Sequence, residues 1–98
     1  MSILHIVNKS PYERNSVERA VEYLRDGDRL LLIEDAVYAV IRGGKAASLI
    51  DGRNAAVLGP DLAARGIAEE KMIDGIEVVD YAGFVDLVEA CDKTQSWL

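Results

Sequence analysis

The stretch Arg29–Ile33, RLLLI, carries four large aliphatic residues in a row. A strand that faces solvent on one side alternates apolar and polar side chains, whereas a strand covered on both sides is apolar at every position. The run therefore predicts a strand that is buried on both faces, which is typical of the parallel sheets of α/β proteins.

Strand-like and helix-like segments alternate on both sides of this run. Short aliphatic segments predict further strands, the last of them a weaker candidate: Ser2–Val7, Ala55–Leu58, Ile76–Val79 and Ala46–Leu49. Apolar residues at helical spacing predict helices between them: Asn15–Leu24 with Asn15 as a cap and Glu18 at the capping-box spacing, residues 34–44, residues 61–66 and Tyr81–Asp92. Strands that are joined through helices run parallel, with right-handed crossovers. We therefore expect an α/β fold, with a small single-domain parallel β-sheet of four to five strands flanked by helices.

The bulk composition limits the classes of function. Ninety-eight residues suffice for one domain, residues 1–98, and the formal charge of −6 argues against direct binding to nucleic acid. The single cysteine, Cys91, excludes an internal disulfide or a cysteine-based zinc site and fits a reducing cytoplasm. We find no targeting segment and no apolar stretch long enough to span a membrane. These features predict a cytoplasmic protein without membrane contact.

Acidic residues follow three of the predicted strands: Glu34, Asp35, Asp61 and Asp80. With Lys9 nearby, they are compatible with a Mg²⁺-dependent phosphoacceptor site or a small ligand-binding module. The alternative is that Asp61 and Asp80 cap helices while the other two acids complement a helix N-terminus. Because this explains each acid where it stands, we expect no metal site. No glycine-rich phosphate-binding motif follows any strand, so we also expect no cofactor.

Nucleophilic chemistry has two candidate residues, His5 and Cys91. His5 lies within the first predicted strand, where a buried or half-buried structural role is the more common one. Cys91 ends the apolar stripe that Phe84, Leu87 and Val88 begin, so it is expected to serve as a small core residue. A persulfide on Cys91 is the alternative.

Two apolar segments indicate contact with another chain. The segment Ala36–Ile41, AVYAVI, has no polar face, and a helix that is apolar all round must be covered on every side. A domain of this size has little interior for it, so part of its surface should be covered by a partner. Trp97 either docks on its own domain or joins that interface. The candidate interface residues are Val37, Tyr38, Val40, Ile41 and Trp97.

The polar loop after the first strand, Asn8–Ser16, carries Lys9, Ser10 and Arg14. Loops at this edge of an α/β sheet often meet a ligand or a partner, so these three residues are candidates for a partner-docking surface. A plain turn is the other interpretation, since Pro11 fixes a bend and Asn15 can cap the helix. The sequence leaves both open.

Five segments, taken in order, resemble one known family: LHIVNKSPYERN (residues 4–15), GDRLLLIEDAVYA (27–39), VLGPDLAARGI (57–67), VVDYAGFVDL (78–87) and CDKTQSWL (91–98). They are similar to the DsrH/TusB family of sulfur-relay subunits, and the resemblance runs over essentially the whole chain. It implies a DsrE-like α/β domain and a cytoplasmic heterohexamer with TusC/DsrF-like and TusD/DsrE-like subunits, two copies of each. It also implies upstream and downstream sulfur-carrier proteins as partners.

The resemblance implies one of two pathways. In the TusB branch the complex relays persulfide sulfur toward 2-thiolation of the wobble uridine of certain tRNAs. In the DsrH branch it serves sulfur oxidation, and in both the main carrier cysteine belongs to the TusD or DsrE subunit. DsrH proteins carry a cysteine in the first helix where this chain has Ala20.

Three hypotheses follow. The first is an accessory, non-catalytic subunit of a sulfurtransferase complex, with no catalytic residue of its own. The second is a sulfur carrier that uses Cys91, and the third is a small ligand- or metal-binding module that uses the acidic strand ends.

Overall fold

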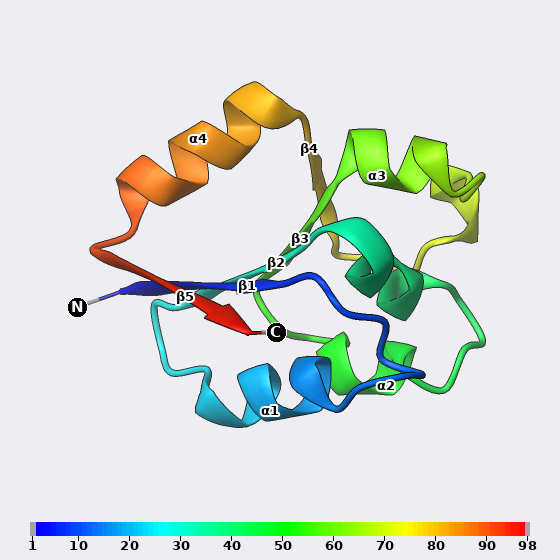
Figure 1. Cartoon of the computed structure of the whole chain (residues 1–98), viewed down its shortest axis with the longest axis horizontal. Helices are drawn as coiled ribbons and strands as arrows, with labels where there is room; N and C mark the ends of the chain where they lie inside the picture. Colours follow the sequence, from blue (N-terminus) through cyan, green and yellow to red (C-terminus); the bar gives the residue numbers. More distant parts are fainter. Residues whose placement is uncertain (1, 98) are drawn as a thin grey trace.

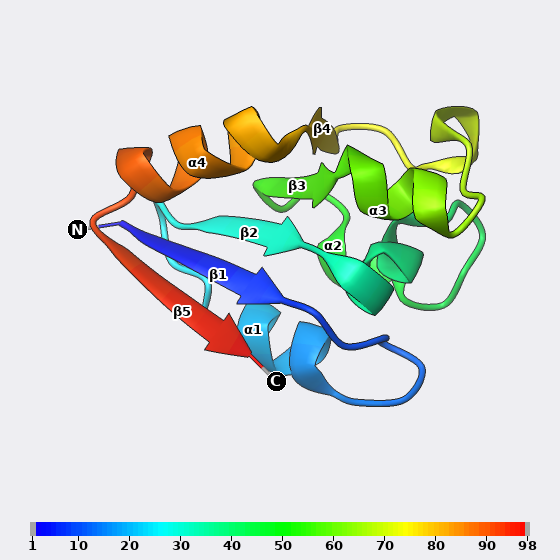
Figure 2. The ribbon, with the colours of Figure 1, turned by 45° about the horizontal axis from the view of Figure 1, so that its top comes forward.

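The computed structural model describes residues 2–97 and contains one five-stranded parallel sheet in the order β4-β3-β2-β1-β5 (Figures 1 and 2). The strands, in chain order, are β1 (Ile3–Val7), β2 (Arg29–Leu32), β3 (Ala55–Leu58), β4 (Glu77–Val79) and β5 (Lys93–Trp97). The expected α/β fold is confirmed. No helix in this part of the chain is long and apolar enough to cross a membrane.

Helices cover both faces of the sheet. The α-helices are α1 (Ser16–Tyr23), α2 (Ala47–Ile50), α3 (Gly59–Ala64) and α4 (Tyr81–Ala90), and the 3-10 helices are η1 (Glu34–Val40) and η2 (Glu69–Lys71). Figure 1 shows α1 and α2 on one side of the sheet and α4 on the other, and Figure 2 shows α3 continuing directly from the arrowhead of β3.

The position of α4 follows from the strand order. The chain lays β1 to β4 side by side in one direction, and then returns past all of them to place β5 on the far side of β1. Right-handed crossovers that step in opposite directions along a parallel sheet lie on opposite faces. The return crossover therefore puts α4 on the face opposite α1.

The RLLLI run forms the middle of this sheet. Leu30 and Leu32 point into the core on one face, and Leu31 points into the core on the other; all three are fully buried. β2 pairs with β1 on one side and with β3 on the other, both parallel. The prediction of a strand covered on both faces is confirmed.

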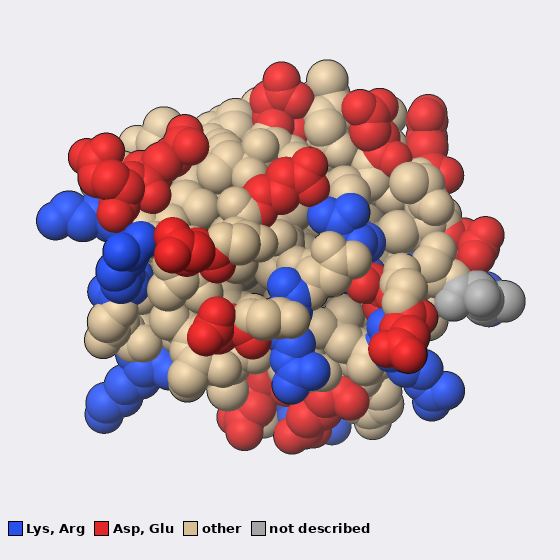
Figure 3. Space-filling view, turned by 180° about the vertical axis from the view of Figure 1, so that it is seen from behind, with Lys and Arg blue, Asp and Glu red and all other residues tan. Residues whose placement is uncertain are grey.

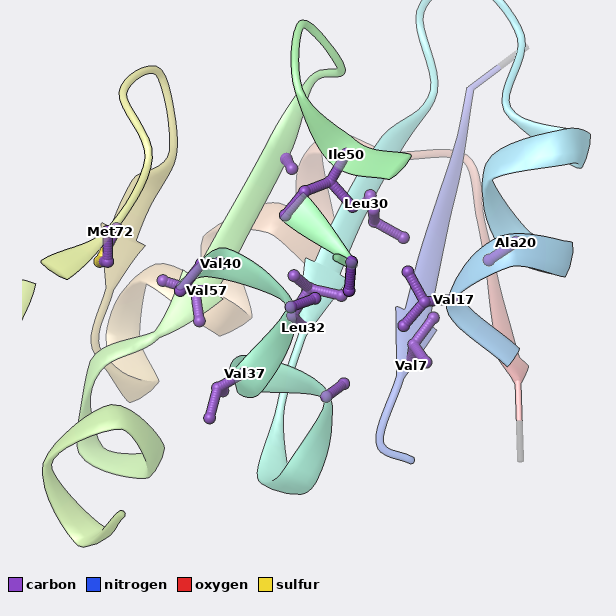
Figure 4. Packing of buried hydrophobic residues seen from close by; sticks show 14 of the residues in the cluster. Val7, Val17, Ala20, Leu30, Leu32, Val37, Val40, Ile50, Val57 and Met72 are labelled. Carbon is purple, nitrogen blue, oxygen red and sulfur yellow. The ribbon is translucent and has the colours of Figure 1, made fainter. Parts of the chain in front are cut away.

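Residues 36–40 of the AVYAVI segment lie in η1, and most of their side chains are enclosed by their own domain. Val37 and Val40 are completely buried, and Figure 4 shows both within a cluster that also contains Leu32, Val57 and Met72. The segment after η1 is held by an antiparallel bridge between Ile41 and Met72. The prediction that a partner covers Val37 and Val40 was therefore wrong.

The physical reason is that η1 lies at the carboxyl end of β2, where α2, α3 and β3 all contact it. Sequence reasoning underestimated the cover that these short elements provide. Tyr38 and Ile41 are half-buried, so a partner contact at these two residues stays a prediction.

Two further segments differ from the sequence predictions. Residues Ala47–Ile50, which overlap the weaker strand candidate Ala46–Leu49, form the helix α2. Ala47 and Ile50 bury one helical face against the core while Ser48 stays exposed. The segment Lys93–Trp97, which was not predicted to be regular, forms β5 and pairs with β1 along its full length.

Candidate functional site

Three of the four acidic strand-end residues, Glu34, Asp35 and Asp61, lie near one another, but protein groups, Arg65 among them, occupy the Asp35 and Asp61 carboxylates. Asp61 lies in the first turn of α3 and accepts a hydrogen bond from the Glu34 N–H at 2.6 Å, which steadies the start of η1. Asp35 pairs instead with Arg65, with its Oδ1 3.0 Å from the guanidinium Nε. Glu34 has a φ of 50°, in the left-handed region that non-glycine residues adopt only where their surroundings hold them. The Asp61 hydrogen bond is such a support.

Asp80 acts as the predicted helix cap. Its Oδ1 accepts a hydrogen bond of 2.8 Å from the Gly83 N–H at the start of α4. Asp61 caps no helix of its own, because α3 already begins at Gly59, and its carboxylate serves η1 instead. Residues 2–97 contain no group of three or more His, Cys, Asp or Glu side chains that could hold a metal ion.

The loop from Asn8 to Ser16 is an ordered turn. Ser10 is buried: its hydroxyl accepts a hydrogen bond from the Tyr12 N–H at 3.2 Å, and its carbonyl accepts from Glu13 and Arg14. The Asn15 side chain makes no cap bond to α1, so the capping-box prediction was wrong.

Lys9 and Arg14 are exposed on this loop. Ser10 builds the turn with its hydroxyl, whereas the exposed side chains of Lys9 and Arg14 can contact a partner. The loop also lines an open depression of about 250 Å³ with Glu18 and Leu49. Docking at Lys9 and Arg14 stays a prediction.

A buried polar cluster joins three distant parts of the chain. His5 is 2% exposed, and its Nε2 lies 3.2 Å from Oδ2 of Asp28, which is 4% exposed. On the other side of the ring, the Trp97 indole N–H donates to His5 Nδ1 at 3.1 Å. The Trp97 ring also packs against Tyr23, with 5.3 Å between the ring centroids. Sequence reasoning placed His5 correctly inside a strand but did not connect it with Asp28 or Trp97.

Asp28 is a charged anchor in this cluster. Burial would raise the pKa of its carboxyl group, but hydrogen bonds from the Ile3 N–H, the His5 ring and the Arg25 N–H outweigh burial, and a positive charge on His5, when its ring is protonated, lowers that pKa further. They hold the pKa of Asp28 below its ordinary value of 3.8. The carboxylate therefore stays ionised and ties the starts of β1 and β2 to the end of α1.

The two positions that bear on sulfur chemistry lie in different cores. Ala20 is fully buried on α1 in the core below the sheet, where it packs with Val17. Cys91 is half-buried just after α4 and packs against the core on the opposite face. The thiol of Cys91 therefore does not substitute for one at residue 20.

An exposed apolar stripe runs along α4. Tyr81 is 63% exposed, Val85 53% and Val88 37%, and the spacing of these residues places them along one side of the helix. Leu87 buries the opposite side against the sheet. We call Tyr81, Val85 and Val88 the α4 stripe.

The core that Leu87 joins is only partly covered. Ile6 and Ile33 pack against this core and are half-buried. Asp86 and Glu89 are exposed on α4 and give the stripe an acidic border. Monomeric proteins seldom expose such clustered large apolar side chains without a binding role.

Sequence reasoning missed the α4 stripe although the signal was present. The helix sequence YAGFVDLVEA carries apolar residues on more than one face, so burial against the sheet on one side leaves some of them uncovered. Figure 3 shows Lys and Arg side chains on the face behind that of Figure 1 interspersed with acidic and uncharged ones, so this face presents no continuous basic patch for a nucleic acid.

Comparisons with known proteins agree on one family. A family model described as "DsrH like protein" matches residues 9–94. A protein TusB from an Enterobacter species is 35% identical over 97 residues, which cover 97% of this chain and 100% of that protein. A protein TusB from Escherichia coli is 31% identical over 99 residues, with 97% and 100% covered.

Solved structures share the fold. The ychN protein from E. coli superposes with a TM-score of 0.81 at 23% identity, covering 99% of both chains. Protein Tm0979 from Thermotoga maritima gives a TM-score of 0.68 at 20% identity, covering 92% of this chain and 93% of its own. At these identities the superpositions support the fold, and the family rests on the sequence matches. The polypeptide belongs to the DsrH/TusB family.

Proposed function

We propose that this chain is an accessory, non-catalytic subunit of a sulfur-relay complex of the TusBCD or DsrEFH type. The observation that carries the proposal is the match to TusB proteins along nearly the whole chain. The surroundings of His5 support a non-catalytic role. The His5 ring is committed to Asp28 and Trp97, and each nitrogen that a base would use already has a partner.

The sulfur-carrying thiol would belong to a companion subunit. Persulfide transfer needs a sulfur atom near the surface, and at residue 20 this chain has a buried methyl group. The role of the subunit is then to stabilise the carrier subunit and to shape the surface on which upstream and downstream carriers dock.

The α4 stripe is the surface we assign to the companion subunit. The occupant is a chain of the same DsrE-like fold, because the heterohexamer implied by the family consists of related subunits. Val85 and Tyr81 supply apolar contact area, and the acidic border of Asp86 and Glu89 calls for basic residues on the facing surface of the partner. An aliphatic and aromatic centre with a charged rim is the usual composition of a specific interface.

Of the two pathways, we propose 2-thiolation of the tRNA wobble uridine. The named relatives are TusB proteins, and the cysteine that DsrH proteins carry in the first helix is Ala20 here. The chain would act on tRNA indirectly, since its net charge of −6 is unsuited to holding the phosphate backbone.

Deletion of the gene in its host tests this function. We expect loss of 2-thiouridine derivatives from bulk tRNA, measured by mass spectrometry of nucleosides, and restoration by the wild-type chain. Restoration by the Cys91→Ser variant is also expected, because this subunit is proposed to carry no sulfur. Unchanged 2-thiouridine in the deletion strain would contradict the tRNA assignment, and co-purification of the companion subunits would then test the complex separately.

A further inference from the structure

The hydrogen bonds around His5 fix where its proton lies. The indole N–H of Trp97 can only donate, so His5 Nδ1 must present a lone pair to it. The single proton of the neutral ring is then on Nε2, where it points toward Oδ2 of Asp28. Both ring nitrogens are occupied, and the imidazole is neutral in this arrangement.

A second proton has one place to bind. It must bind Nδ1, and two N–H groups would then face each other across the 3.1 Å that now separates Trp97 Nε1 from His5 Nδ1. The Asp28 carboxylate compensates the new charge on the ring, but the indole N–H of Trp97 has no second hydrogen-bond acceptor within residues 2–97. A cavity of about 300 Å³ lies beside His5 and Trp97. Two other titratable residues line it, Tyr23 from α1 and Lys93 from β5.

The Trp97 side chain packs the end of β5 against the domain. The first four residues of β5 are exposed, and Trp97 is its one half-buried side chain. Its indole rests between His5 and Tyr23, at ring-centroid distances of 6.1 Å and 5.3 Å. Since β5 pairs with β1 alone among the described strands, Trp97 is the side chain that holds the end of this edge strand against the domain.

We propose that the Asp28–His5–Trp97 chain is a proton-controlled latch on the C-terminal strand. Neutral His5 accepts the indole hydrogen bond and keeps β5 closed. Uptake of one proton from solvent at Nδ1 breaks that hydrogen bond and releases the Trp97 end of β5. Release widens the cavity of about 300 Å³ that Ile3, Tyr23 and Gln95 line, and it frees the edge of β1 for another strand.

The tryptophan itself reports the state of the latch, since the sequence contains one tryptophan and one histidine. We would lower the pH from 8 to 5, a range in which histidine changes charge. Asp28 stays ionised over this range because its pKa lies below 3.8. We expect the Trp97 emission to shift to longer wavelength and its indole N–H resonance to move and broaden. Protection of the β5 amides against hydrogen exchange, corrected for intrinsic rates, should fall on the order of tenfold.

Two variants separate the latch from a general effect of acid. His5→Asn keeps an acceptor near the Nδ1 position but does not titrate, so its Trp97 emission should stay constant between pH 8 and 5. Trp97→Phe removes the indole donor, so its β5 amides should exchange fast at both pH values. Unchanged emission and β5 protection in the wild-type chain from pH 8 to 5 would overturn the proposal. So would an acid transition in His5→Asn that matches the wild-type transition.

Discussion

At the residue scale, Asp28 is a buried polar group that joins separate segments of the chain. It comes directly before β2, yet its carboxylate accepts hydrogen bonds from the Ile3 N–H, from the Arg25 N–H and from the His5 ring. A buried carboxylate is stable only where donors surround it in this way. Asp28 therefore connects the amino ends of two strands with the end of a helix.

Asp28→Asn should destabilise the fold and flatten its response to acid. The carboxamide places an N–H where three donors converge, so we expect a loss of about 2 kcal/mol in the free energy of unfolding at pH 7. Because the pKa of Asp28 is lower in the folded than in the unfolded chain, its stabilisation is complete above pH 3.8 and is lost as the pH falls below that value. Urea unfolding at a series of pH values measures both effects.

The matched control for Asp28 is Asp26→Asn, two residues away and exposed. It should behave like the wild-type chain, because the Asp26 carboxylate has no comparable set of donors. If Asp28→Asn followed the wild-type stability curve at every pH, the assigned role of the carboxylate would be refuted.

Single residues were predictable where the reason for their position is local. The burial of His5 and the cap at Asp80 follow from the strand and helix patterns around them, and both predictions are confirmed. The contact of Trp97 with His5 joins residues 92 positions apart, and Asp28 meets its donors only once β1 lies beside β2. No local pattern contains that information.

At the element scale, α4 is positioned by close packing against β4. An added Cβ at Gly83 would lie 2.8 Å from the Val79 Cβ, so the helix approaches the strand as closely as a residue without a side chain allows. The Asp80 cap holds the first turn of α4 at the same place.

Gly83→Ala should therefore lower the stability although alanine is the better helix former. The clash with Val79 requires α4 to shift from the sheet, and we expect a net loss of about 1–2 kcal/mol in a thermal or urea unfolding measurement. The comparison is Ala82→Gly, at an exposed neighbouring position where only helix propensity changes, by about 1 kcal/mol. A gain of stability in Gly83→Ala would show that Val79 does not constrain the helix.

Helices and strands, like single residues, were predictable where the local sequence pattern allows one interpretation. β1 to β4 carry aliphatic runs, and the four were found because such runs have few uses other than buried strands. β5 reads KTQSW and has no apolar alternation, since an edge strand with an exposed face needs none. The weaker candidate at Ala46–Leu49 was wrong because four residues do not separate a helical face from a strand.

At the scale of the whole molecule, the fold was predictable and the position of the exposed apolar surface was not. Alternation of strands with helices defines a parallel α/β sheet, whatever the details of each helix. Which apolar helix remains exposed depends on how the short elements fill space. Here they enclose η1 and leave Tyr81 and Val85 of α4 uncovered.

Cys91 is not expected to carry sulfur. Cys91→Ser changes one half-buried side chain next to the core under α4, so a modest loss of stability is expected and sulfur transfer through the assembled complex should be unchanged. Loading with a cysteine desulfurase and mass spectrometry of each subunit makes the measurement. A persulfide on Cys91, together with lost transfer in the variant, would favour the carrier hypothesis instead.

The most direct test of the central claim is the mass of the complex formed with the companion subunits. Co-expressed wild-type chain should appear in a mixed oligomer by native mass spectrometry. Val85→Asp places a charge in the centre of the α4 stripe and should weaken that oligomer at least tenfold while the isolated chain stays folded. Ser48→Asp puts the same charge at an exposed position of α2, on the opposite face of the sheet, and this variant should assemble like wild type. A Val85→Asp complex as abundant as wild type, or a wild-type chain that joins no companion, would contradict the account.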